Sequence, residues 1–201
     1  MRVLITCGPT WVAMDDVRVI SNQSTGEIGH LIAQACLNKG LDVTLLEGPV
    51  THPWSHKKVK LIRYQYFDEL RRHLDIQLKK KFDVVIHAAA VSDFKVAKVL
   101  KGKISSKKSL TLKLSPTVKL IDQIKIKAPD VFLVGFKLEP GLGLKNVVAE
   151  SKVLFKKAQC DLVVANSIER GYQGFIVNNS GKVLSRAGNK KRLAAELVKL
   201  L

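Results

Sequence analysis

A polar turn at residues 20–29, with the sequence ISNQSTGEIG, contains residue types that suit ligand chemistry. It carries only two of the three glycines of the dinucleotide-binding pattern G-x-G-x-x-G, and Ser24 stands where the first glycine should be. Ser24 and Thr25 offer hydroxyl groups, and Asn22 offers an amide that both donates and accepts hydrogen bonds. At the start of a helix, where backbone N–H groups are free, these side chains predict a phosphate-binding turn.

Helix capping offers a second interpretation of the same turn. Ser24 and Glu27 have the spacing of a capping box, and apolar residues follow at helical spacing up to Gly40, which is typical of a helix C-terminus. Asn22 is also common in Asx turns, where its side chain binds the neighbouring backbone. The turn alone therefore leaves phosphate binding and ordinary capping as alternatives.

A second polar group, HAAAVSDF at residues 87–94, follows an apolar run. Its three alanines are small enough for a flat base or a sugar to approach the backbone closely. At the end of a strand, Asp93 could bind an exocyclic amine, a ribose hydroxyl or a magnesium-bound water. We expect His87, taken alone, to be a core or rim histidine rather than a catalyst.

The third group lies in a basic segment at about residues 96–114, which lacks helical periodicity and which we expect to form an arm or flap. Lys101 and Lys103 lie there in the sequence KGKISS. A lysine on a mobile arm can close over a phosphate and stabilise negative charge that develops during a reaction. Solubility is the alternative explanation for each of these lysines taken singly.

The elements that must position these groups alternate between strand and helix. Apolar runs predict strands at 2–6, 43–46, 59–62, 84–86, 131–136, 162–165 and 175–177. Helical periodicity follows the turn at 20–29 and recurs at 67–81, 145–157 and 193–201. Between them we expect a strand at 110–114 and a short helix that begins at Pro116. This order predicts an α/β fold with a doubly wound, Rossmann-like, mostly parallel sheet, helices on both faces and ligands at the carboxyl ends of the strands.

The composition predicts one soluble, cytoplasmic domain over residues 1–201 without a membrane anchor. Hydrophobic residues make up 46% of the 201 residues, which is enough for one substantial core. The formal net charge of +17 favours phosphorylated or polyanionic partners. Only 6% of the residues are aromatic, which argues against an aromatic platform for single-stranded nucleic acid. The three cysteines have neither disulfide nor zinc-site spacing, so we expect reduced and mostly buried thiols.

Taken together, several segments of the chain resemble the phosphopantothenate–cysteine ligase family. In chain order they are ITCGPT at 5–10, ISNQSTG at 20–26, GPV at 48–50, AAVSD at 89–93, KISS at 103–106, VGFKLE at 134–139 and DLVVAN at 161–166. The resemblance implies that a nucleoside triphosphate, with Mg²⁺, activates the carboxylate of 4′-phosphopantothenate, and that the amine of cysteine then attacks the acyl-nucleotide. CTP, the usual bacterial nucleotide, is favoured over ATP.

The same resemblance implies a homodimer of the free-standing ligase type. No flavin is then expected in this chain, and a separate flavin-dependent decarboxylase is a further expected partner. We expect neither a specific nucleic acid nor a membrane among the partners.

The resemblance also assigns roles to individual residues. Asn22 is expected to contact the acyl intermediate, and Lys103 to stabilise charge while the acyl-nucleotide forms. The residues expected beside the nucleotide are His87, Ala88, Ala89, Asp93, Lys103, Pro116, Thr117, Val118, Lys119, Phe136, Lys152 and Lys156.

Two further points qualify this set of residues. Lys152 and Lys156 keep the family's four-residue spacing but lie two residues further than expected from Asp161, so Lys157 could take one of the roles. Physical reasoning adds four candidates for phosphate contacts: Gly8, Thr10, Ser24 and Thr25. Metal ligands stay unassigned.

Two other functions are compatible with parts of the sequence. An NAD(P)-dependent oxidoreductase would suit the alternation of strands and helices and Glu47 at the end of the second strand. Against it stand the incomplete glycine pattern and the absence of a Tyr-x-x-x-Lys pair. A basic nucleic-acid-binding module would suit the charge, and its binding would weaken steeply with salt.

Overall fold

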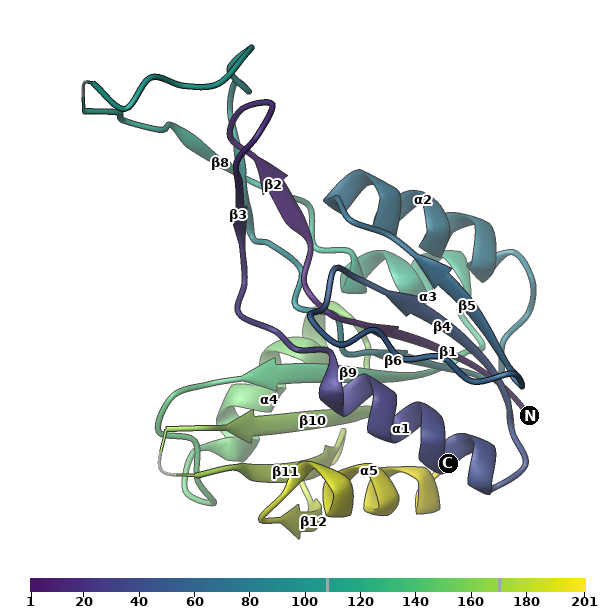
Figure 1. Cartoon of the computed structure of the whole chain (residues 1–201). Helices are drawn as coiled ribbons and strands as arrows, with labels where there is room; N and C mark the ends of the chain where they lie inside the picture. Colours follow the sequence, from purple (N-terminus) through teal and green to yellow (C-terminus); the bar gives the residue numbers. More distant parts are fainter. Residues whose placement is uncertain (108, 170) are drawn as a thin grey trace.

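A mostly parallel sheet of eight strands forms the centre of the protein (Figure 1). The structure is a computed structural model and describes residues 1–107, 109–169 and 171–201. The strands are β1 Arg2–Cys7, β4 Asp42–Glu47, β5 Val59–Arg63, β6 Val84–His87, β9 Phe132–Leu138, β10 Leu162–Ser167, β11 Gln173–Asn178 and β12 Val183–Ala187. Their order is β12-β11-β10-β9-β6-β1-β4-β5, with β11 antiparallel to both of its neighbours, β10 and β12, and all other adjacent strands parallel.

Helices cover both faces of this sheet. On one face lie α1 Glu27–Asn38 and α5 Lys190–Lys199, and on the other lie α2 Phe67–Leu78, α3 Ile124–Lys127 and α4 Val147–Lys157 (Figure 1). Strand β1 shows why: Val3 and Ile5 pack into the core under α1, whereas Leu4 packs into the opposite core. Strands buried on both faces need continuous apolar runs, so the doubly wound prediction is confirmed. None of the described helices is long and apolar enough to span a bilayer.

Two small antiparallel pairs project from the sheet (Figure 1). Strand β2 Trp11–Ala13 pairs with β3 Val19–Ser21, and β7 Phe94–Val96 pairs with β8 Leu114–Pro116. The segment between β7 and β8 is the arm that the basic sequence predicted; residue 108 within it lies outside the described part of the chain. The β2–β3 hairpin was not predicted, because strands of three residues are too short to show an apolar period.

The chain around Pro116 differs from the sequence-based expectation. The strand expected at 110–114 lies at Leu114–Pro116, and the helix expected from Pro116 begins only at the 3₁₀ turn Ile121–Gln123, which leads into α3. Pro116 instead pairs with Phe94 at the end of the small β7–β8 sheet. Proline is tolerated at such an edge because its missing N–H leaves no central ladder bond unmade. Both predictions were therefore wrong in position.

The start of α1 also differs from the expected capping box. Gly26, not Ser24, precedes the first helical residue, and its φ of 72° lies in the left-handed region. The Oγ of Ser24 accepts from the N–H of Gly26 at 3.4 Å, whereas Glu27 accepts from Lys190 Nζ at 2.5 Å. Gly40, with φ 77°, follows the helix end as predicted. The predicted capping box was therefore wrong, and the side chain of Ser24 does not cap α1.

Candidate active site

A pocket of about 830 Å³ lies at the carboxyl ends of β6, β9 and β10. This is where a doubly wound sheet is expected to bind ligands. Of the residues predicted from the sequence, those that line the pocket are Asn22, Ser24, His87, Ala88, Ala89, Asp93, Thr117, Val118, Lys119 and Phe136. The fold therefore brings segments separated by more than a hundred residues to one cavity.

The side chain of Asn22, in the turn before α1, contacts the backbone of the segment that follows β6. Its Nδ2 donates to the carbonyl of Ala90 at 3.1 Å and to that of Val91 at 3.2 Å. Carbonyl oxygens can only accept, so the amide must face them with its NH₂ group, and both its protons are used. The Oδ1 of Asn22 remains as an acceptor for a ligand N–H.

His87 lies at the end of β6 and is only 6% exposed. Its Nδ1 lies 2.9 Å from Thr6 Oγ1, which also accepts from the backbone N–H of Ala89 at 3.2 Å. Burial lowers the pKa of His87 from 6.5 to about 4, because the interior disfavours the charged imidazolium. His87 is thus a buried and neutral residue at physiological pH, and its burial agrees with the expected core or rim histidine.

Asp93 and Lys119 form an ion pair at the mouth of the pocket, with Nζ and Oδ1 2.5 Å apart. The neighbouring Thr117 is fixed by two bonds: its Oγ1 donates to Ser92 O at 2.7 Å and its N–H donates to Asp93 O at 2.9 Å. Both side chains of the ion pair are more than half exposed, so their mutual attraction is weak in water. A bound polyphosphate or cation could therefore exchange partners with them.

The wall formed by β9 and β10 adds residues that the sequence analysis did not select. Lys137 and Glu139 line the pocket and pair at 2.5 Å, and Asn166 joins them from β10. Lys157 lines the pocket from the last turn of α4, which favours the alternative raised for that lysine. These residues could have been found from their position in the sequence, because each lies at or just after the end of a predicted strand or helix.

Several predicted site residues do not line this pocket: Gly8, Thr10, Thr25, Lys103, Pro116, Lys152 and Lys156. Thr10 is fully buried, and its Oγ1 accepts from the N–H of Ser92 at 2.9 Å. Gly8 has φ 78°, and a Cβ there would lie 3.0 Å from Gly48 N. Thr10 and Gly8 therefore hold the strand ends together around the pocket.

Lys103 lies on the arm between two anchored neighbours. The N–H of Ile104 donates to Asp15 Oδ2 at 2.9 Å, and the N–H of Gly102 donates to Asp16 Oδ2 at 2.8 Å. Arg18 Nη2 donates to Ile104 O at 2.5 Å. The hydrogen bond from Ile104, with others from the β2–β3 turn, lowers the pKa of Asp15. The hairpin that the sequence did not predict thus fixes the backbone on both sides of Lys103.

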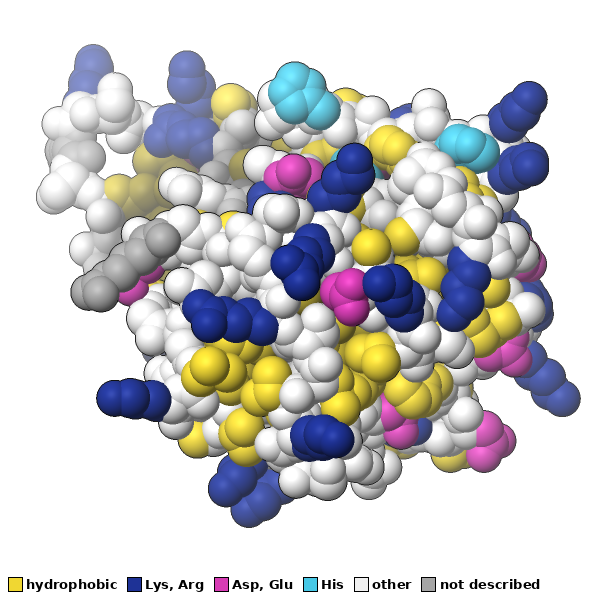
Figure 2. Space-filling model, turned by 90° about the horizontal axis from the view of Figure 1, so that it is seen from below, with side chains coloured by type: hydrophobic (Ala, Val, Ile, Leu, Met, Phe, Trp, Pro, Cys, Tyr) yellow, Lys and Arg dark blue, Asp and Glu magenta, His cyan; other side chains and the backbone are white. Residues whose placement is uncertain are grey.

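The cysteines and the surface charge complete the description of the site. Cys7, Cys36 and Cys160 are free and buried, as predicted, and burial raises the pKa of each thiol. Among the described residues, one group of three could hold a metal ion, and it contains Cys7 with His30 and Glu47. Lysine and arginine side chains are dispersed over the face shown in Figure 2 and form no continuous stripe on it.

The sheet and its strand-end pocket define a Rossmann-like α/β protein. The chain belongs to the family described as the DNA/pantothenate metabolism flavoprotein C-terminal domain, whose model matches residues 1–199. The resemblance seen in the sequence segments is therefore confirmed.

Individual relatives agree with this family. The chain is 40% identical over 169 residues to the coenzyme A biosynthesis bifunctional protein CoaBC of Thermococcus kodakarensis, which covers 84% of this chain and 41% of the relative. It spans about half or less of the length of the curated relatives it matches. A solved DNA/pantothenate metabolism flavoprotein from Streptococcus pneumoniae is 25% identical, with a TM-score of 0.88 over 100% of this chain and 97% of that one. A solved C-terminal domain of CoaBC is 26% identical, with a TM-score of 0.80 over 99% and 92%.

Proposed function

We propose that the pocket joins 4′-phosphopantothenate to cysteine in coenzyme A biosynthesis, using a nucleoside triphosphate. The observation that carries this proposal is the convergence in one pocket of Asn22 with His87, Asp93 and the segment Thr117–Lys119. The name of the Thermococcus relative, a coenzyme A biosynthesis protein, supports the same assignment. The pocket is also large enough for a nucleotide-sized ligand.

In the first half-reaction, an oxygen of the substrate carboxylate attacks the α-phosphorus of the nucleotide. An acyl-nucleotide forms, and the bond to the β-phosphate breaks to release pyrophosphate. Lys119, Lys137 and Lys157 line the pocket and can stabilise the negative charge that gathers on the phosphates.

Mg²⁺ fits the acidic side chains of the same pocket. The carboxylates that line it are Asp93, Asp122 and Glu139. Magnesium is usually held by one or two carboxylates together with substrate phosphates, so these residues suffice without a preformed cage. When bound, the ion would neutralise part of the phosphate charge.

In the second half-reaction, the cysteine nitrogen attacks the acyl carbon and the amide bond forms. The nitrogen loses one proton to solvent, and the nucleoside monophosphate leaves with the oxygen of the broken C–O bond. Asn22 Oδ1 is placed to accept from the attacking amine, because its NH₂ group is held by the carbonyls of Ala90 and Val91. The amide therefore orients the nucleophile without exchanging protons with it.

Lys103 supplies positive charge for the first half-reaction from the arm. The anchors at Gly102 and Ile104 set the position of its backbone, so Asp15, Asp16 and Arg18 act as positioning residues for this lysine. Because Lys103 does not line the pocket, the arm must either bend toward it or reach the pocket of a second copy.

A homodimer supplies that second copy in our proposal. Apolar side chains on the hairpin and the arm are exposed, including Val17 at 65%, Val99 at 49% and Leu114 at 44%. Exposed apolar residues gathered on one projection are typical of an interaction surface. Light scattering should then give the mass of two chains.

The activity test incubates the protein with 4′-phosphopantothenate, cysteine and Mg²⁺, with CTP or ATP in parallel. We expect monophosphate release that requires both acceptor substrates, and a higher rate with CTP. Monophosphate release at the level of a mixture without phosphopantothenate, with both nucleotides, would refute the assignment. The product keeps the cysteine carboxyl group, and we propose that a flavin-dependent decarboxylase acts on it next.

A further inference from the structure

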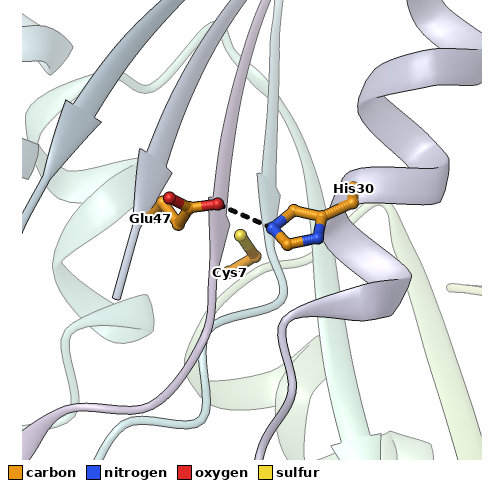
Figure 3. A group of neighbouring side chains, drawn as sticks. All are labelled: Cys7, His30 and Glu47. Carbon is orange, nitrogen blue, oxygen red and sulfur yellow. Dashed lines mark hydrogen bonds and ion pairs between the residues drawn. The ribbon is translucent and has the colours of Figure 1, made fainter. Parts of the chain in front are cut away.

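A second cluster of reactive side chains lies outside the pocket, at Cys7, His30 and Glu47 (Figure 3). Cys7 ends β1 and Glu47 ends β4, and the two residues are direct partners in the parallel register. His30 reaches them from the first turns of α1. One ligand atom from each residue lies within 4.8 Å of the other two, and His30 Nε2 lies 2.8 Å from Glu47 Oε1.

The close approach of α1 to β1 creates this cluster. A Cβ at Gly29 would lie 2.2 Å from the Cβ of Cys7, so only glycine lets the helix lie directly on the strand end. His30 then follows above the thiol. Trp54 covers the outer side of the imidazole, with ring centroids 6.0 Å apart and planes 16° apart. Gly29, part of the incomplete glycine pattern, thus serves to assemble the cluster.

Cys7 and Glu47 are buried and His30 is partly buried, and the Glu47 carboxylate is held by several contacts. Glu47 is 1% exposed, and its Oε2 accepts from Arg63 Nε at 3.3 Å. Its Oε1 faces His30 and also accepts from the N–H of Trp54 at 3.0 Å. A carboxylate oxygen can accept a hydrogen bond and bind a cation together, so the contacts of Glu47 orient it toward the sulfur and the imidazole.

We propose that Cys7, His30 and Glu47 bind one divalent zinc ion. A thiolate, an imidazole and a carboxylate are the ligand types that zinc takes, and zinc sites with three protein ligands keep a fourth position for water. With zinc's usual bond lengths, tetrahedral geometry separates ligand atoms by about 3.4 to 3.6 Å. His30 and Glu47 need to move apart by less than an ångström from 2.8 Å, and the sulfur needs to move inward.

The charges and protons of this site balance. Coordination replaces the S–H bond of Cys7 with a sulfur–zinc bond and releases one proton to solvent. His30 Nε2 faces Glu47 Oε1 (Figure 3), and to bind zinc through Nε2 the neutral imidazole must carry its proton on Nδ1 instead. The thiolate and the carboxylate then neutralise the two positive charges of zinc.

Zinc at this place would tie together the ends of β1, β4 and α1. The turn that carries Asn22 and Ser24 leads directly into α1, so the ion would stabilise the neighbouring pocket wall without contacting its ligands. We therefore expect zinc to raise the melting temperature of the whole chain. This inference does not depend on the ligase reaction.

The test titrates the chelator-treated full chain with Co²⁺ and follows the thiolate-to-cobalt charge-transfer absorption. We expect the band to saturate at one equivalent and to disappear when Zn²⁺ is added. Cys7→Ala should abolish the band, whereas Cys36→Ala, which removes another buried free thiol, should keep it. A wild-type protein without the band at one equivalent, or a Cys7→Ala variant that keeps it, would overturn the proposal.

His30→Gln provides a second test that does not depend on the folding of the Cys7 variant. Glutamine can still donate to Glu47 but is a poor zinc ligand, so the hydrogen bond is retained while the metal site is lost. We expect metal affinity to fall by more than about tenfold, as for other losses around a metal centre. Unchanged affinity in a folded His30→Gln protein would also overturn the proposal.

Discussion

The pocket and the arm hold their functional groups by different means. In the pocket, His87 is buried at a strand end, and Asn22 is fixed by two backbone carbonyls of the segment that follows β6. On the arm, Lys103 is held through side-chain contacts from Asp15 and Asp16 to its neighbours. Strand ends in a packed sheet open only with much of the fold, whereas a few surface hydrogen bonds open locally. We therefore expect the strand ends to fix binding geometry and the arm to deliver charge.

Replacing the lysine on the arm should have the largest effect. Lys103→Gln keeps the length and polarity of the side chain but removes its charge, so we expect pyrophosphate release to fall by about 10²- to 10³-fold. The measurement is the rate of pyrophosphate release with phosphopantothenate and CTP in the absence of cysteine. Lys101→Gln, two residues earlier on the same arm, is the control and should keep most of the rate. Equal losses of rate in both variants would show that the arm acts through its overall positive charge and not through Lys103 in particular.

Replacing the amide in the pocket should affect the other half-reaction. Asn22→Asp loses the two N–H donors that face the carbonyls of Ala90 and Val91, and its carboxylate is repelled by them. We expect the acyl-nucleotide to accumulate while amide formation slows by about 10²-fold. Rapid quenching and chromatography measure both quantities. Gln23→Glu, which adds the same charge at the next pocket residue, should not cause accumulation.

Weakening the anchor of the arm should give an intermediate loss. Asp15→Asn replaces the carboxylate that accepts from Ile104, Val17 and Arg18 backbone N–H groups. We expect about a tenfold slower pyrophosphate release and a lower unfolding free energy, because one backbone N–H loses its acceptor. Asp16→Asn keeps an oxygen that can accept the single bond from the N–H of Gly102, so it should cost less by both measurements. An Asp15→Asn enzyme with a wild-type first half-reaction would show that the hairpin does not position Lys103.

The anchor also has a defined pH dependence. The pKa of Asp15 is lowered in the folded chain. Its stabilisation is therefore complete above the unfolded-state pKa of about 3.9 and is lost as the pH falls from there through the lower folded value. The difference in unfolding free energy between wild type and Asp15→Asn should shrink over that range.

His87 should have the smallest effect on turnover and a distinct effect on stability. Because its folded pKa is about 4 and its unfolded pKa about 6.5, only the unfolded chain gains this proton as the pH falls between those values. Folding should weaken over that window by on the order of 3 kcal/mol from this residue. Urea unfolding of the wild type and of His87→Asn at pH 7 and pH 4.5 measures this change in the free energy of unfolding. A wild-type pH dependence that persists unchanged in the variant would contradict the buried neutral state.

The parallel sheet was predictable because its strands are buried on both faces and show as apolar runs, such as Val84 to Ile86. The β2–β3 hairpin was not predictable from the sequence. Trp11 and its neighbours are held by pairing across the hairpin and by the edge-on contact of Trp11 with Tyr66, and neither contact shows as a local pattern. The capping-box spacing misled because sequence spacing does not reveal the left-handed backbone of Gly26.

The candidate site was predictable where its residues lie at or near the carboxyl ends of strands, as His87 and Phe136 do. Lys137 and Asn166 were missed, although they stand at the same strand ends, because single polar residues there have no distinctive spacing. Cys7, His30 and Glu47 are far apart in the chain and meet only through strand register and helix packing. No local sequence motif could therefore have predicted that cluster.

The central claim is that the pocket activates the substrate carboxylate by joining it to the nucleotide. The most direct measurement uses 4′-phosphopantothenate whose carboxylate carries oxygen-18 and locates the label by mass spectrometry after one turnover. The account predicts one labelled oxygen in the phosphate of the nucleoside monophosphate for each amide formed. Label in pyrophosphate or orthophosphate, with an unlabelled monophosphate, would contradict it.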